Sequence, residues 1–220
     1  MKKIKIDIVS DLVCPWCYIG QKRLNDALSE GKYEAEISWK PFQLHPELEK
    51  EGMEKEAFLM QKFGAKGSSI FDQMKAVAVS EGLEMNPDEI KNIPNTINVH
   101  RLMWFARKSE KDQALAKALF KAYFSEGKDF SNDETLLEIG ERVGLDKIAI
   151  AEFLDSQEAF AEVDLEERSY REAGINAVPT FILNDKYMIQ GAQNAETFIK
   201  AFEQLEVEMT ADFQCTGDNC

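Results

Sequence analysis

The sequence has little cysteine, proline and glycine, and it has no long apolar run. Four cysteines, 6 prolines and 12 glycines occur among 220 residues, which excludes a collagen-like or linker-dominated chain. No stretch of about 18 apolar residues occurs, so no transmembrane helix is expected. Lys5 and Asp7 interrupt the first apolar residues, so the amino-terminal segment does not resemble a secretory signal.

Positive charge is also scarce, with 26 Lys and Arg residues against 40 Asp and Glu residues and a net charge of −14. An acidic surface repels phosphate, so neither nucleic acid nor an anionic membrane is expected as a partner. The hydrophobic share of 44% and the charged share of 30% are ordinary for a globular chain. We therefore expect a soluble, cytoplasmic protein with a full hydrophobic core.

The first 42 residues predict a β-α-β unit. Residues 3–10 alternate in polarity, which is typical of a strand, and residues 34–42 alternate again. Between them, apolar residues at helical spacing predict a helix that opens near Cys14 and ends before Gly31. The unit is long enough for two parallel strands joined by a crossover helix.

The rest of the chain predicts a block of helices and then a ββα unit. Residues 45–174 show helical stripes, including a capping box that starts at Ser131 and a long helix from about Ser156. Strands over 179–183 and 186–189 flank the turn residues Asn184 and Asp185. A final helix, capped by Asn194, keeps its apolar stripe as far as Leu205. No clear periodicity follows Leu205.

This layout predicts an α/β protein of order βαβ…ββα with a large helical insertion. One discontinuous domain comprises residues 1–44 and 175–206, and an inserted helical subdomain comprises residues 45–174. Residues 207–220 form a carboxyl-terminal tail with a second cysteine pair.

The motif Cys14-Pro15-Trp16-Cys17 carries the clearest chemistry. A sulfur at a helix amino terminus meets unpaired N–H groups and partial positive charge, so we expect the pKa of Cys14 to fall below the free value of about 8.5. Pro15 suits the first helical position, which needs no N–H. Cys17 lies one turn along, so Cys14 would attack a disulfide and Cys17 would resolve the mixed disulfide. Trp16 offers apolar surface to a substrate.

A half zinc site is the alternative interpretation of the same two cysteines. Cys215 and Cys220 would have to supply the other two ligands. A strand followed by a long helix favours redox chemistry over zinc, so we assign no metal. Thiol–disulfide exchange needs no organic cofactor.

Three parts of the chain carry a family resemblance: the segment DLVCPWCYIG at 11–20, the helical insertion, and AVPTF at 177–181. They resemble the DsbA family of thioredoxin-fold oxidoreductases, in particular its FrnE-like branch, which is related to 2-hydroxychromene-2-carboxylate isomerases and kappa-class glutathione transferases. The resemblance covers nearly the whole chain. It implies a thioredoxin-like fold and, as partners, protein or peptide thiols and disulfides, with glutathione as a further candidate. No oligomeric state is assigned.

The resemblance also implies that Pro179 is a cis-proline facing the cysteines. A proline there lacks an N–H, and the Val178 backbone beside it would pair with an extended substrate strand. A simple strand-entry proline is the alternative.

His100 and Arg101 belong to the segment 95–101, which resembles a signature of the same branch. There they would bind a carboxylate or glutathione, although a packed or surface histidine is the simpler interpretation of His100. His45 is expected to do no chemistry. Ser10 and Asp11 precede the cysteine motif, and the sequence assigns neither of them a role.

Two rival functions remain at this stage. One is a glutathione-dependent transferase or isomerase; isomerase-type relatives carry serine where this chain has Cys14, which favours thiol exchange. The other is a metal-binding or holdase-like module that uses the helical insertion.

Cys215 and Cys220 are separated by four residues that include Gly217 and Asp218, so a turn can bring the two sulfurs together. A second redox pair is our interpretation, and unpaired surface cysteines or metal capture are the alternatives. FrnE-like relatives can carry an additional carboxyl-terminal cysteine pair, which agrees with the redox interpretation.

Overall fold

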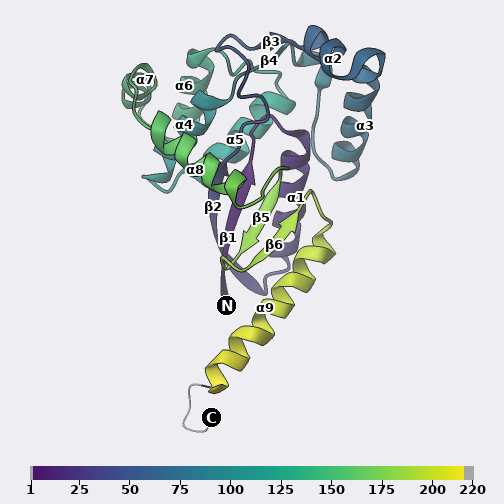
Figure 1. Ribbon diagram of the computed structural model, residues 1–220, viewed down its shortest axis with the longest axis vertical. Coiled ribbons are helices and arrows are strands. Elements are labelled where there is room, and N and C mark those ends of the chain that lie inside the picture. Colours follow the sequence, from purple (N-terminus) through teal and green to yellow (C-terminus); the bar gives the residue numbers. More distant parts are fainter. Residues whose placement is uncertain (1, 216–220) are drawn as a thin grey trace.

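A four-stranded sheet forms the base of the molecule in the computed structural model, which describes residues 2–215 (Figure 1). The strand order is β2-β1-β5-β6. The strands are β1 (Lys2–Ser10), β2 (Tyr33–Pro41), β5 (Thr180–Leu183) and β6 (Tyr187–Gln190). β1 pairs parallel with β2 and antiparallel with β5, and β5 pairs antiparallel with β6. The sequence-based βαβ…ββα prediction is therefore confirmed.

Two helices pack together beside this sheet: α1 (Pro15–Ser29), the predicted crossover, and α9 (Ala195–Cys215). The alternation in β1 explains the packing, because Ile4, Ile6 and Ile8 are all buried in the main hydrophobic core. Asp7, between them, points to the other face of the strand. β1 therefore contributes the three isoleucines of one face to this core, and the charged Asp7 stays on the other face.

The predicted turns and caps at the end of the chain are confirmed. Asn184 and Asp185 have φ of 49° and 55°, the left-handed pair that a two-residue hairpin turn requires. The Asn194 Oδ1 accepts the Thr197 N–H at 3.0 Å and so caps α9. At α6 the cap is one residue later than expected, because Asn132 rather than Ser131 accepts the Glu134 N–H.

The sequence shows no clear periodicity after Leu205, but α9 continues to Cys215. Contacts distant in sequence hold this extension: the Tyr33 hydroxyl donates to Glu206 at 3.0 Å, and Lys186 pairs with Glu208 at 2.7 Å. Residues 207–215 are therefore helical backbone rather than an irregular tail. Cys220 lies outside the described residues.

Most of the inserted helices gather at the end of the sheet where β1 runs into α1 (Figure 1). The helices are α2 (Lys55–Phe63), α3 (Gly67–Ser80), α4 (Ile97–Arg107), α5 (Asp112–Phe124), α6 (Asp133–Arg142), α7 (Lys147–Asp155) and α8 (Phe160–Glu172). Short pieces accompany them: β3 (Met53–Glu54) pairs with β4 (Asn92–Ile93), and single 3₁₀ turns cover Gly64–Lys66 and Pro87–Glu89.

The helix predicted from about Ser156 begins only at Phe160, because Ala159 before it has a left-handed φ of 66°.

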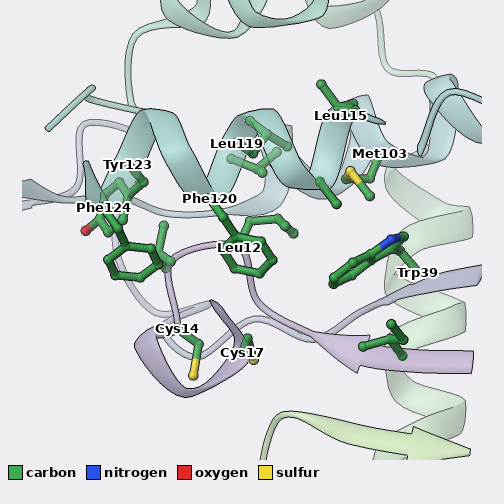
Figure 2. Packing of buried hydrophobic residues seen from close by; sticks show 14 of the residues in the cluster. Leu12, Cys14, Cys17, Trp39, Met103, Leu115, Leu119, Phe120, Tyr123 and Phe124 are labelled. Atoms are coloured by element: carbon green, nitrogen blue, oxygen red, sulfur yellow. The ribbon is translucent and has the colours of Figure 1, made fainter. Parts of the chain in front are cut away.

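The insertion and the sheet share one hydrophobic core. A continuous cluster of buried residues runs from Ile8 in β1 through Leu12 and Trp39 to Phe120 in α5. Figure 2 shows Leu12 and Trp39 packed under α5, with Cys14 and Cys17 at the edge of the cluster. The cysteines are thus held against packed side chains. Within the described part of the chain, no helix is both long and apolar enough to cross a membrane.

Candidate active site

Cys14 is the N-cap residue of α1, as the sequence predicted. Its backbone is extended, with φ −84° and ψ 117°, and Pro15 occupies the first helical position. The Cys14 carbonyl accepts the N–H groups of Cys17 at 3.0 Å and Tyr18 at 3.2 Å, which begins the helix. The Cys14 side chain therefore lies where the first turn of α1 leaves N–H groups without intrahelical partners.

Cys17 lies one turn further along α1, next to Cys14 (Figure 2). Both cysteines are free thiols, and only 2% of Cys17 is exposed. Burial raises the pKa of the Cys17 thiol well above its ordinary value, and the neighbouring Cys14 raises it further. The Ser10 hydroxyl and the Asp11 main-chain N–H oppose this by stabilising a Cys17 thiolate. The raised pKa therefore keeps the Cys17 thiol protonated until the step in which its thiolate attacks.

The loop before β5 brings Val178 and Pro179 to the cysteines. The Val178–Pro179 peptide bond is cis, and the Cys14 thiol donates to the Val178 carbonyl at 3.9 Å. Pro179 also lies against Gly20 of α1. The structure therefore brings together four of the residues singled out from the sequence: Cys14, Cys17, Val178 and Pro179.

A cavity of about 320 Å³ opens beside Cys14. Trp16, which is 39% exposed, lies on one wall of this cavity, and Val178 lies near it. The rest of the lining is mostly apolar and includes residues of the insertion: Phe58, Phe63, Ile70, Phe71, Met74, Ile93 and Tyr123. Among the described residues, no Asp or Glu lines the cavity, in contrast to the acidic chain as a whole.

His45 and Lys62 are basic side chains that line this cavity; the sequence analysis expected His45 to do no chemistry and did not single out Lys62. The Lys62 Nζ lies 3.3 Å from the His45 Nε2, and the His45 ring packs edge-on against Phe58. Burial, and then the charge of Lys62, lower the pKa of His45, so its ring favours the neutral form. The neutral Nε2 can then accept a hydrogen bond from Lys62. The only signal for this part of the cavity in the sequence was Lys62, which lies among the aromatic residues of α2.

Arg101 does not line this cavity, and its predicted substrate role needs correction. The guanidinium donates to the main-chain carbonyls of Phe153, Leu154, Ser156 and Glu158 and to the Asn98 side chain. These five hydrogen bonds use the five donors that an arginine has. Phe160 also lies against its plane, 3.9 Å from the ring centre. Arg101 therefore ties α4 to the α7–α8 connection and has no donor left for a substrate carboxylate.

His100 is also absent from the cavity wall, and here the packed-histidine interpretation fits the structure. The residue is buried, and its Nε2 lies 3.5 Å from the Asp11 Oδ1. A carboxylate of the protein itself thus occupies the place predicted for a substrate carboxylate. Asp11, to which the sequence assigned no role, is the neighbour that His100 faces.

The cysteines have no set of metal ligands around them in the part of the chain that the structure describes. No three His, Cys, Asp or Glu side chains gather there as a metal site would require. The backbone at Cys215 lies at the far end of α9, away from the start of α1 (Figure 1). Its predicted partner Cys220 is outside the described residues, so the second redox pair stays a prediction.

A C-x-x-C motif at a helix amino terminus, on a sheet of this topology and beside a cis-proline, defines a thioredoxin-type dithiol protein. The model of the DSBA-like thioredoxin domain family matches residues 5–203, so the chain belongs to this family.

Two known proteins are similar to this chain over most of its length. The uncharacterized protein YwbO of Bacillus subtilis is 28% identical over 204 residues, covering 90% of this chain and 95% of the relative. The probable DsbA oxidoreductase SCO1869 of Streptomyces coelicolor has a TM-score of 0.82 at 29% identity, covering 91% of this chain and 89% of the other.

Two more distant structures share the fold. A 2-hydroxychromene-2-carboxylate isomerase has a TM-score of 0.67 at 17% identity, covering 95% of this chain and 98% of the other. The cytosolic disulfide reductase DsbM of Pseudomonas aeruginosa, solved with glutathione, has a TM-score of 0.59 at 17% identity, covering 96% and 99%. At this level of identity, the two neighbours show the likeness of fold alone.

Proposed function

We propose that this protein is a thiol–disulfide oxidoreductase that acts on protein or peptide substrates through Cys14 and Cys17. One observation carries the proposal: both thiols are buried, with 4% of Cys14 and 2% of Cys17 exposed, but Cys14 lies at the N-cap of α1 and lines the cavity, whereas Cys17 is not among its lining residues. The two thiols are therefore unequal in access, as an attacking and a resolving cysteine must be.

The reaction proceeds in two displacements. The Cys14 thiolate attacks one sulfur of a substrate disulfide, which forms a mixed disulfide and releases the other substrate sulfur as a thiolate that takes up a proton. Cys17 then gives up its proton, and its thiolate attacks the Cys14 sulfur. The remaining substrate sulfur leaves and is protonated. The substrate gains two electrons and two protons, and Cys14 and Cys17 become a disulfide that an external dithiol reduces. The same steps run backwards oxidise a substrate dithiol.

The cavity beside Cys14 supports an apolar peptide as the substrate. Its aromatic and aliphatic lining would bury a large side chain next to the reacting cysteine. Val178, on the same wall, would pair with the extended substrate backbone, and Trp16 would cover it. Glutathione stays a further candidate partner, because the DsbM structure is described with glutathione.

A cytoplasmic location is part of the proposal. The four cysteines occur as two closely spaced pairs, which is the pattern of redox motifs rather than of a structural disulfide framework.

Insulin reduction with dithiothreitol tests the proposal. Cys215→Ser and Cys220→Ser form the background, so that only the Cys14–Cys17 pair reacts. In this background we expect rapid precipitation of the insulin B chain, and adding Cys14→Ser should return the rate to that of dithiothreitol alone. A Cys14→Ser protein that reduces insulin as fast as the background protein would contradict the proposal.

A further inference from the structure

The apolar cavity beside Cys14 has its basic side chains in one place. Among the described residues that line it, Lys62 and His45 are the basic ones, and no Asp or Glu joins them. Lys62 is exposed, so its ammonium group is accessible to a molecule that enters the cavity. A substrate bound at Cys14 therefore meets a largely apolar surface that carries one cationic group.

Uncharged groups hold the Lys62 side chain. Its Nζ lies 3.3 Å from the His45 Nε2, and it lies 5.3 Å from the centre of the Phe58 ring and 5.8 Å from that of the Phe63 ring. An aromatic ring attracts a cation but carries no net charge. Among the described residues, Lys62 forms no ion pair with a carboxylate. Its positive charge is therefore positioned without being neutralised.

Glu47 contacts the other nitrogen of the His45 ring. Its Oε1 lies 3.3 Å from the His45 Nδ1, and 67% of its side chain is exposed. The carboxylate accepts hydrogen bonds only, so we assign the ring hydrogen to Nδ1 and leave Nε2 to accept from Lys62. A lysine has three N–H donors, and the contact with His45 uses one of them. Donors of Lys62 thus remain for a ligand.

We propose that Lys62 binds a carboxylate of the substrate, so that the favoured substrates carry a glutamate or aspartate close to an apolar residue beside the reacting cysteine. The inference rests on the proposed function and names its substrate class. The apolar side chain would be buried against the aromatic lining, and the carboxylate would accept a charge-assisted hydrogen bond from Lys62. The net charge of −14 repels acidic peptides in general, so a preference for them has to arise locally.

Internal competition between peptide disulfides tests the inference. The peptides contain Cys-Leu with either glutamate or glutamine at the first or the second position after leucine. In the background with serine at 215 and 220, the ratio of kcat/KM for the glutamate peptide to that for the glutamine peptide should fall about two- to fivefold upon Lys62→Met at one of these positions. The loss should appear in KM, and high salt should reduce it. Lys62→Arg keeps the charge and should keep the ratio.

Two control variants separate a local charge from general effects. Lys117→Met removes a positive charge at an exposed position of α5 outside the cavity, and Gln61→Met changes the exposed neighbour of Lys62 that does not line it. Both should leave the ratio unchanged. The inference is overturned if Lys62→Met keeps the ratio at both peptide positions, or if either control lowers it as much as Lys62→Met does.

Binding without reaction distinguishes this inference from the proposed function. Peptides with serine in place of cysteine cannot exchange disulfides, but they should protect Cys14 from iodoacetamide. The glutamate peptide should half-protect Cys14 at a lower concentration than the glutamine peptide, and Lys62→Met should remove this difference. If the background protein fails to reduce insulin while the difference persists, the proposed function is wrong and the carboxylate site stands. If insulin is reduced but neither assay shows a preference, the carboxylate site is wrong.

Discussion

Gly20 of α1 lies directly against Pro179. A Cβ atom added at Gly20 would meet the Pro179 Cγ at 2.9 Å and the Phe181 Cζ at 3.2 Å. The first contact is shorter than Cβ atoms in proteins show and the second is tighter than most, so Pro179 and Phe181 would both have to shift. The first helix and the loop that carries Val178 can therefore pack this closely because Gly20 has no side chain.

Gly20→Ala should consequently destabilise the protein. In an ordinary helix the change would stabilise by about 0.5–1 kcal/mol, but overpacking against Pro179 should cost about 1–3 kcal/mol and so outweigh this gain. Chemical denaturation measures the difference, and insulin reduction should slow as the Val178 carbonyl is pushed from Cys14. Asn25→Ala, at an exposed position of the same helix, is the matched control. A Gly20→Ala protein as stable as Asn25→Ala would disprove the tight contact.

The two thiols should differ in their response to pH. Cys14 lines the cavity, whereas burial raises the pKa of Cys17, so alkylation near neutral pH should modify Cys14 first. The raised pKa also has a consequence for stability. It favours the folded, reduced protein below the unfolded cysteine pKa of about 8.5, and this contribution is lost as the pH rises towards the folded value. Peptide mapping after short iodoacetamide pulses across pH follows the order, and equal labelling of both cysteines at neutral pH would contradict it.

The cavity should discriminate between substrates. Phe71→Ala removes an aromatic wall of the cavity. For a peptide disulfide with a leucine or phenylalanine next to cysteine, kcat/KM should therefore fall several-fold. The reason is that each Å² of apolar surface that is no longer buried costs about 25 cal/mol. Glutathione disulfide, which has no large apolar side chain, should be affected less. Met60→Ala, exposed on α2 and outside this cavity, is the control. Equal losses for both substrates would argue against an apolar subsite.

Local patterns in the sequence were sufficient for the elements that hold the cysteines. Strand alternation before Cys14, a proline at the first helical position and the Asn184-Asp185 turn are all set by neighbours in the chain, and the structure has each of them. The placement of Cys14 at the N-cap followed from these patterns. The contact with Val178 followed from the family resemblance.

The errors concern residues whose surroundings are distant in sequence. Arg101 was expected near substrate, but its partners are carbonyls more than 50 residues further along the chain. His100 faces Asp11, 89 positions earlier, and no periodicity in α4 reveals which buried group it meets. Likewise α9 extends past Leu205 because Tyr33 and Lys186 meet it there. Each outcome depends on how helices pack, which residue spacing within one helix does not determine.

Trapping the mixed disulfide tests the central claim most directly. In the background with serine at 215 and 220, Cys17→Ser removes the resolving thiol, so a peptide disulfide should remain attached to the protein. We predict one peptide per chain by intact mass, mapped to Cys14 after digestion, and no adduct once Cys14→Ser is added. The absence of an adduct in the Cys17→Ser protein, or an adduct that persists without Cys14, would contradict the assignment of Cys14 as the nucleophile.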